Sequence, residues 1–202
     1  MFADLLSSRL ASFRKLSDEQ ADQLRRHYDL LVRWNKVLNL TAIRTLEEAV
    51  ERHYCESIFA AAHLPQGRLS IADLGSGAGF PGIPIAVVRP ECSVTLIESH
   101  QRKAVFLREA ARELANVRVI GRRAEDVSDR FDWVVSRAVR YSDIAEDLKR
   151  LGESVELLTG GVGLSDLPGF DWQAPVRLPW GQHRLLWIGR LVSRETDKNL
   201  ES

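Results

Sequence analysis

Apolar and polar positions follow a helical period over the first third of the chain. A capping box at residues 17–20 (SDEQ) opens a run whose apolar side chains recur every three or four positions. A second box at residues 45–48 (TLEE) opens a similar run, which continues to Ala61, and residues 65–67 (PQG) end the helical part. Two or three amphipathic helices cannot bury their apolar stripes alone. We therefore expect residues 1–67 to form a helical extension that packs on the rest of the chain.

The pattern changes at residue 69, where short apolar runs begin to alternate with amphipathic ones. Strands alternating with helices predict a mostly parallel, doubly wound sheet with right-handed crossovers. We therefore expect residues 68–194 to form a Rossmann-like α/β domain and residues 195–202 to be a frayed tail. The predicted strands are 69–74, 93–98, 117–121, 131–136, 155–159 and 184–191, and the predicted helices are 82–90, 101–114 and 141–151.

The composition is that of a globular protein. The 202 residues are 45% hydrophobic and 28% charged, which excludes a disordered chain and a disulfide-dense module. No apolar run approaches the ~20 residues that cross a bilayer, and the first residues lack the apolar core of a signal peptide. Cys55 and Cys92 are the only cysteines and lie far apart, so we expect no zinc site and no disulfide. These features favour a cytoplasmic protein without a membrane segment.

The net charge is zero, but the cations are unevenly distributed. Of the 28 basic residues 23 are arginine, the side chain suited to bidentate phosphate contacts. Residues 99–140 hold ten cations against six anions. A local basic face permits a nucleic-acid partner without requiring one. The alternative explanation for the many arginines is coding bias, with their side chains on solvated helix faces.

The strongest local motif is a glycine turn, DLGSGAGFPG at residues 73–82, directly after the first predicted strand. In an open parallel sheet a ligand lies outside the carboxyl ends of the strands, beside this turn. A dinucleotide fingerprint requires a third glycine at position 80, where this chain has Phe80. The spacing is instead GxGxG, at Gly75, Gly77 and Gly79. It predicts a ligand site, and the alternative is a turn whose glycines serve packing alone.

Acidic residues lie beside the turn and after the next two strands. Asp73 is placed to attract a cation such as an amino-acid ammonium group. Glu98 ends the second strand, 23 residues after Gly75, where a carboxylate accepts the ribose hydroxyls of an adenosine. Asp126 follows the third strand, where an adenine amino group would lie. Together these acids favour S-adenosylmethionine over NAD as cofactor. The alternative for Glu98 and Asp126 is an ordinary surface carboxylate.

Longer segments of the chain resemble the bacterial ribosomal small-subunit RNA methyltransferase G family (glucose-inhibited division protein B). The resemblance implies a class I S-adenosylmethionine-dependent methyltransferase fold with an N-terminal helical extension. It also implies methylation of N7 of a guanine in the 530 loop of 16S rRNA, and hence 16S rRNA or the small ribosomal subunit as partner. By position, the cofactor contacts it implies are Gly75, Phe80, Ala124, Glu125 and Arg137. The matching segments are WNKVLNLTAI (34–43), RHYCES (52–57), DLGSGAGFPGIPIAVVRP (73–90), LIES and RKAVFL (96–107), RRAED (122–126) and FDWVVSRA (131–138).

Methyl transfer to N7 sets modest chemical demands. N7 of guanine has a lone pair and no proton to lose, so no general base is needed and the protein positions the reactants. We assign no catalytic residue; Arg137 is a positioning candidate, with a structural ion pair as its alternative. His53 is expected to pack or hydrogen-bond between extension and sheet, with catalysis as its alternative. The cleft is expected to be lined from the extension by Trp34, Asn35, Lys36, Asn39 and Thr41. The alternative is that Trp34 and Leu38 are core residues and Asn39 caps a turn.

Four cations are candidates for phosphate contacts with RNA: Lys36, Arg102, Lys103 and Arg140. We expect a monomer without a bound metal. Two other functions stay open at this point, a class I methyltransferase of a small molecule and a nucleotide-binding module without catalysis.

Overall fold

The computed structural model describes residues 1–137, 140–160, 164 and 167–192, so the predicted tail at 195–202 lies outside the described residues. Within these ranges no helix is long and apolar enough to span a membrane.

Five helical segments form the amino-terminal part. They are α1 (Phe2–Leu10), α2 (Asp18–Leu38), α3 (Leu46–Ala49), η1 (Val50–Cys55) and α4 (Glu56–His63). Ser17 and Gln20 bond reciprocally at the start of α2, as the capping box predicts, and the side chain of Thr45 caps α3. The second predicted helix is not a uniform α-helix, because its middle, η1, is a π-helix. Such segments are rare and are frequent at functional sites.

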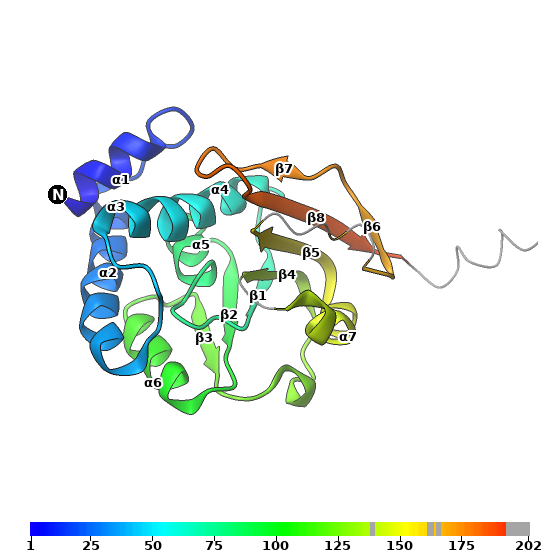
Figure 1. Cartoon of the computed structure of the whole chain (residues 1–202). Coiled ribbons are helices and arrows are strands. Elements are labelled where there is room, and N and C mark those ends of the chain that lie inside the picture. Colours follow the sequence, from blue (N-terminus) through cyan, green and yellow to red (C-terminus); the bar gives the residue numbers. More distant parts are fainter. Residues whose placement is uncertain (138–139, 161–163, 165–166, 193–202) are drawn as a thin grey trace, which may run out of the picture.

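The sheet has the strand order β3-β2-β1-β4-β5-β8-β6, with β7 beside β8. The first five strands are parallel and β8 runs antiparallel to β5, which confirms the predicted mostly parallel, doubly wound sheet (Figure 1). The short strands β6 and β7 were not predicted. The strands are β1 (Ser70–Leu74), β2 (Ser93–Ile97), β3 (Val117–Ile120), β4 (Phe131–Arg137), β5 (Gly152–Thr159), β6 (Phe170–Trp172), β7 (Val176–Arg177) and β8 (Leu185–Leu191).

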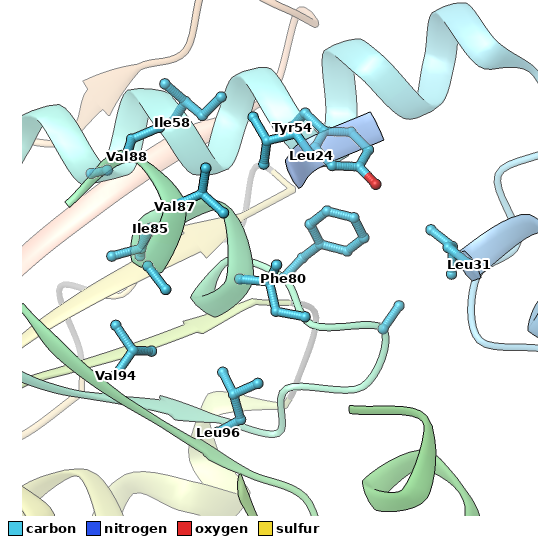
Figure 2. Packing of buried hydrophobic residues seen from close by; sticks show 14 of the residues in the cluster. Leu24, Leu31, Tyr54, Ile58, Phe80, Ile85, Val87, Val88, Val94 and Leu96 are labelled. Atoms are coloured by element: carbon cyan, nitrogen blue, oxygen red, sulfur yellow. The ribbon is translucent and has the colours of Figure 1, made fainter. Parts of the chain in front are cut away.

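Helices cover both faces of the sheet. Alternate residues of a strand point to opposite faces, so Ile71 packs in the core shared with the extension, whereas Ala72 packs in the core on the α7 side. The extension buries Leu24, Tyr54 and Ile58 in the same cluster as α5 (Figure 2). The helices are α5 (Gly82–Val88), α6 (Gln101–Ala110) and α7 (Tyr141–Leu151), with a 3₁₀ turn, η2 (Ala124–Asp126).

Strand order reverses between β1 and β4, because the chain runs outward from β1 through β2 to β3 and then returns to β4 on the other side. Ligands of open α/β sheets bind in the crevice at the carboxyl ends of the strands at such a switch point. The glycine turn comes directly after β1 at that place.

Candidate functional site

The glycine turn is fixed to the end of β2. The amides of Gly75 and Ser76 both donate to the carbonyl of Ile97, at 3.0 and 3.2 Å. Gly75, Gly77 and Gly79 all have positive φ, at 73°, 55° and 87°, a region that favours glycine. The backbone of the turn therefore has one defined shape beside the crevice.

The glycines differ in what surrounds them. A Cβ on Gly79 would lie 2.5 Å from Ile83 Cδ1, and one on Gly82 would lie 2.6 Å from Asp73 Oδ2. Packing alone excludes side chains at those two positions. A Cβ on Gly77 would meet only the carbonyl oxygen of Gly75, at 3.7 Å. Gly77 is therefore the position where the turn presents open backbone to a ligand.

The carboxylate of Glu98 lies under this open position. Its Oε2 accepts from the amide of Gly77 at 2.9 Å and its Oε1 accepts from the amide of His100 at 2.8 Å. Each carboxylate oxygen has a second lone pair, so Glu98 can still accept hydroxyl groups while it holds the turn.

Asp73 is fully buried behind the turn. Its Oδ2 accepts from the amide of Gly82 at 3.0 Å, whereas its Oδ1 has no partner among the described residues. Burial raises the pKa of Asp73 to about 7, against the lowering effect of the Gly82 hydrogen bond. A buried carboxylate oxygen without a partner calls for a donor, and the ammonium group predicted from the sequence is one such donor.

A residue of α7 anchors the segment after β3 by hydrogen bonds. The guanidinium of Arg150 donates to the carbonyls of Ala124, at 2.5 Å, and Val127. Glu125 and Asp126 are exposed on η2. The sequence singled out this turn but not Arg150, since a basic residue in the last turn of a helix has no distinguishing pattern.

Phe80 points from the turn into the extension (Figure 2). Its ring, 5% exposed, stacks on His53 with centroids 4.4 Å apart and meets the edge of Tyr54 at 5.0 Å. The side chain is enclosed by the extension, which leaves the backbone of Phe80 for any cofactor contact.

Two buried histidines of the extension hold the turn and its surroundings. Tyr54 Oη donates to Nδ1 of His27, whose Nε2–H donates to the carbonyl of Ala78 in the turn, both at 3.0 Å. Burial lowers the pKa of His27 to about 4. His27 lies in the apolar stripe of α2. The helical period of that stripe was the sequence signal that could have indicated its burial.

His53 packs between extension and sheet, as expected. Arg137 donates to its Nδ1, and since a guanidinium only donates, the proton is on Nε2, which lies 2.8 Å from Thr41 Oγ1. Burial, with Arg137 as the next cause, lowers the pKa of His53 to about 2. Both histidines are thus neutral and hydrogen-bonded at both ring nitrogens.

Arg137 is directed at the extension. It donates to the carbonyl of Arg52 and lies 3.7 Å from Glu56, a fully buried carboxylate that Arg184 also binds, at 2.8 Å through its Nε. Burial lowers the pKa of Arg137 to about 10, so it stays a cation at neutral pH. The structural ion pair, the alternative role for Arg137, is therefore present. Arg184 was missed because it lies 128 residues from Glu56.

The cations of residues 99–140 do not form one basic face, contrary to one interpretation of their density. Arg118 and Arg130 line a hollow with Ser70 and Ser93, at the amino ends of the strands, and Arg137 is half-buried, with 12% of its side chain exposed. Among the RNA candidates, Lys36 and Arg102 are exposed, Lys103 is half-buried, and Arg140 lies 3.9 Å from Asp143.

The other residues of the WNKVLNLT segment serve local structure. Trp34 donates to Glu109 on α6 at 3.1 Å and packs against Phe106. Asn39 ends α2 with a φ of 47°. The side chain of Asn35 forms two hydrogen bonds with the backbone of Thr41. Of the two alternatives, the core and turn roles are the ones observed.

Known proteins resemble this chain in sequence. The family model described as "rRNA small subunit methyltransferase G" matches residues 20–158. Proteins named ribosomal RNA small subunit methyltransferase G are similar in sequence: that of Xanthomonas campestris pv. campestris (strain B100) is 46% identical over 130 residues, 62% of this chain and 60% of that protein. The one from Nitrosospira multiformis is 43% identical over 141 residues, 68% of this chain and 63% of that protein. The chain thus spans about three fifths of these relatives.

Solved structures share the fold at low sequence identity. An S-adenosylmethionine-dependent methyltransferase from Aquifex aeolicus has a TM-score of 0.58 at 17% identity, covering 72% of this chain and 93% of its own. The pyocyanin biosynthetic protein PhzM has a TM-score of 0.61 at 14% identity, covering 82% of this chain and 62% of its own. These comparisons confirm the predicted fold class and the resemblance carried by the sequence motifs.

Proposed function

We propose that this chain, which belongs to the rRNA small subunit methyltransferase G family, transfers a methyl group from S-adenosylmethionine to N7 of a guanine in the 530 loop of 16S rRNA. The observation that carries the proposal is the open backbone at Gly77, held by Glu98 at the point where strand order reverses. The names of the relatives support rRNA as the substrate.

The residues around the turn fit this cofactor. Glu98 would accept the ribose hydroxyls, the backbone of Gly75, Gly77 and Phe80 would line the methionine side, and Asp73 Oδ1 would gain the donor that it lacks. Gly79 supports the turn by allowing close packing. Ala124 and Glu125, on the turn held by Arg150, would border the adenine.

Arg137 serves this site by positioning. Its guanidinium carbon lies 5.8 Å from the centre of the Phe80 ring, and its hydrogen bond orients His53 against the same ring. Direct contact of Arg137 with the cofactor remains a prediction.

The residues near the turn suit a reaction without a general base. When bound, S-adenosylmethionine would supply a sulfonium methyl group and leave as S-adenosylhomocysteine. N7 of guanine has a lone pair and no proton to lose. His27 and His53, which contact the turn, use both ring nitrogens in structural hydrogen bonds. The protein's contribution is therefore orientation of the two reactants.

RNA binding would use cations at the surface of the protein. Lys36, Arg102, Lys103 and Arg140 are the candidates for phosphate contacts, each releasing counterions when it neutralises a phosphate. We propose that the enzyme works in the cytoplasm as a monomer on 16S rRNA or the small subunit.

Mapping the methyl group tests the proposal. Small ribosomal subunits from a strain without this enzyme are incubated with the protein and S-adenosylmethionine, and borohydride reduction followed by aniline cleaves the RNA at N7-methylguanine. We expect one new cleavage in the 530 loop of 16S rRNA. Methyl transfer to another RNA position, or to small molecules alone, would refute the substrate assignment.

A further inference from the structure

A hollow of about 200 Å³ lies between α2 and the loop of residues 39–45 that comes after it. On its apolar side are Leu31, which is buried, and Tyr28 and Ile43, which are half-buried. On its polar side are Asn35 and two exposed cations, Lys36 and Arg44. An apolar wall beside two cations suits a ligand with a ring and an anionic group.

The loop that forms one wall is rigidly built. The Asn35 side chain accepts from the amide of Thr41 at 2.9 Å and donates to its carbonyl at 3.0 Å, as a neighbouring strand would. Thr41 Oγ1 accepts from the amide of Ile43 at 3.1 Å. The hollow therefore exists before any ligand arrives.

Its two cations differ from four other cations of the extension. Arg9, Arg25, Arg26 and Arg52 all form ion pairs with carboxylates. Within the part of the chain that the structure describes, Lys36 and Arg44 form none. They are free to meet an anion.

Among the residues that the structure describes, no acidic residue lines the hollow. Asp29 and Glu47 are close enough to contribute, after burial, to the raised pKa of Tyr28, but neither residue lines the hollow. The hollow between α2 and α6 is different, because Asp29, Glu109 and Glu113 line it together with its arginines. Charge thus favours an anionic ligand in the first hollow and not in the second.

We propose that the hollow between α2 and residues 39–45 binds a nucleotide of the RNA substrate, an inference that rests on the proposed function. The phosphate lies between Lys36 and Arg44, and the base or sugar lies against Tyr28 and Ile43. Base–aromatic contact of this kind is tolerant of sequence.

The hollow lies next to the cofactor turn but is separated from it. Thr41, in its wall, is 2.8 Å from His53, and His53 stacks on Phe80 of the turn. Because His53 and the side chain of Phe80 stand between the hollow and the backbone of the turn, the bound nucleotide is not the target guanine itself.

Charge variants test the inference by titrating labelled protein with small ribosomal subunits that lack the methyl group. We expect Lys36→Ala and Arg44→Ala each to weaken binding several-fold and to reduce the salt slope by about one. Matched controls are Lys15→Ala and Arg68→Ala, exposed cations outside the hollow that form no ion pair within the described ranges. These should bind like the wild type.

A bulky substitution separates shape from charge. Val32, 43% exposed, lines the hollow, whereas Val37, 77% exposed on the same helix, does not. We expect Val32→Trp to fill the space and weaken binding several-fold and Val37→Trp to leave it unchanged. If the enzyme methylates 16S rRNA but the variants of the hollow bind subunits like their controls, the inference is overturned and the proposed function stands. A wild-type protein that methylates no RNA overturns both.

Discussion

The imidazole of His53 lies face to face with the phenyl ring of Phe80, with centroids 4.4 Å apart and planes 9° from parallel. His53 belongs to the π-helical segment of the extension, and Phe80 to the glycine turn after β1. The same imidazole bonds Arg137 of β4 and Thr41 of the loop after α2. The extension therefore sets the shape of the turn directly.

Replacing His53 with phenylalanine keeps a ring against Phe80 but removes both hydrogen bonds. We expect Arg137 to lose one of its acceptors and the affinity for S-adenosylmethionine to fall about tenfold, the effect of roughly one lost hydrogen bond. Calorimetry measures the dissociation constant. His63→Phe, the same exchange at the end of α4, is the control and should leave it unchanged. An unaltered constant in a folded His53→Phe protein would show that the extension does not shape the site.

His27 makes stability depend on pH. The unfolded chain takes up a proton at His27 below pH 6.5, whereas the folded protein does so only near its pKa of about 4. The contribution of neutral His27 is thus full above pH 6.5 and is lost as the pH falls toward 4, by at most about 1.4 kcal/mol per pH unit. We expect the difference in unfolding free energy between wild type and His27→Gln, from urea titrations, to shrink between pH 7 and 5. A constant difference would contradict a buried, neutral His27.

The sequence predicted the sheet and the turn because both depend on local patterns. The GxGxG spacing, Glu98 and the apolar strand runs lie within short windows, and the structure places them together. The sequence did not predict η1, since a single short π-helical segment inside a helical run has no distinguishing pattern. Nor did it predict β6 and β7, which are three and two residues long. Contacts such as Arg184 with Glu56 join distant segments and have no local signal.

Removing Arg184 should be costly. Arg184→Met leaves the fully buried Glu56 carboxylate with Arg137, 3.7 Å away, as its remaining cation. We expect a loss of about 3 kcal/mol or more in unfolding free energy. Arg184→Lys keeps a cation beside Glu56 and should lose less. An Arg184→Lys protein as unstable as Arg184→Met would argue against this explanation.

Glu156 on β5 is another buried carboxyl, and neither of its oxygens has a partner among the described residues. Burial raises its pKa well above the ordinary value of 4.5. The folded state therefore keeps a proton that the unfolded chain releases, and stability is lost as the pH rises above 4.5. Glu156→Met should be more stable than wild type, by a margin that grows from pH 5 to 8 in thermal melts. A margin that is absent or shrinks with pH would contradict a protonated Glu156.

Cofactor binding at Gly77 is tested most directly by calorimetric titration of wild type and Gly77→Ala with S-adenosylmethionine, and with NAD for comparison. An alanine at the φ of 55° found at Gly77 destabilises the folded state by about 1–2 kcal/mol. The added Cβ would clash with no neighbouring atom, so the variant should fold. We expect wild type to bind one S-adenosylmethionine and no NAD, and Gly77→Ala to bind at least tenfold more weakly. Equal affinity in the folded variant, or a folded wild type that binds NAD and not S-adenosylmethionine, would contradict a methyl-donor site on this turn.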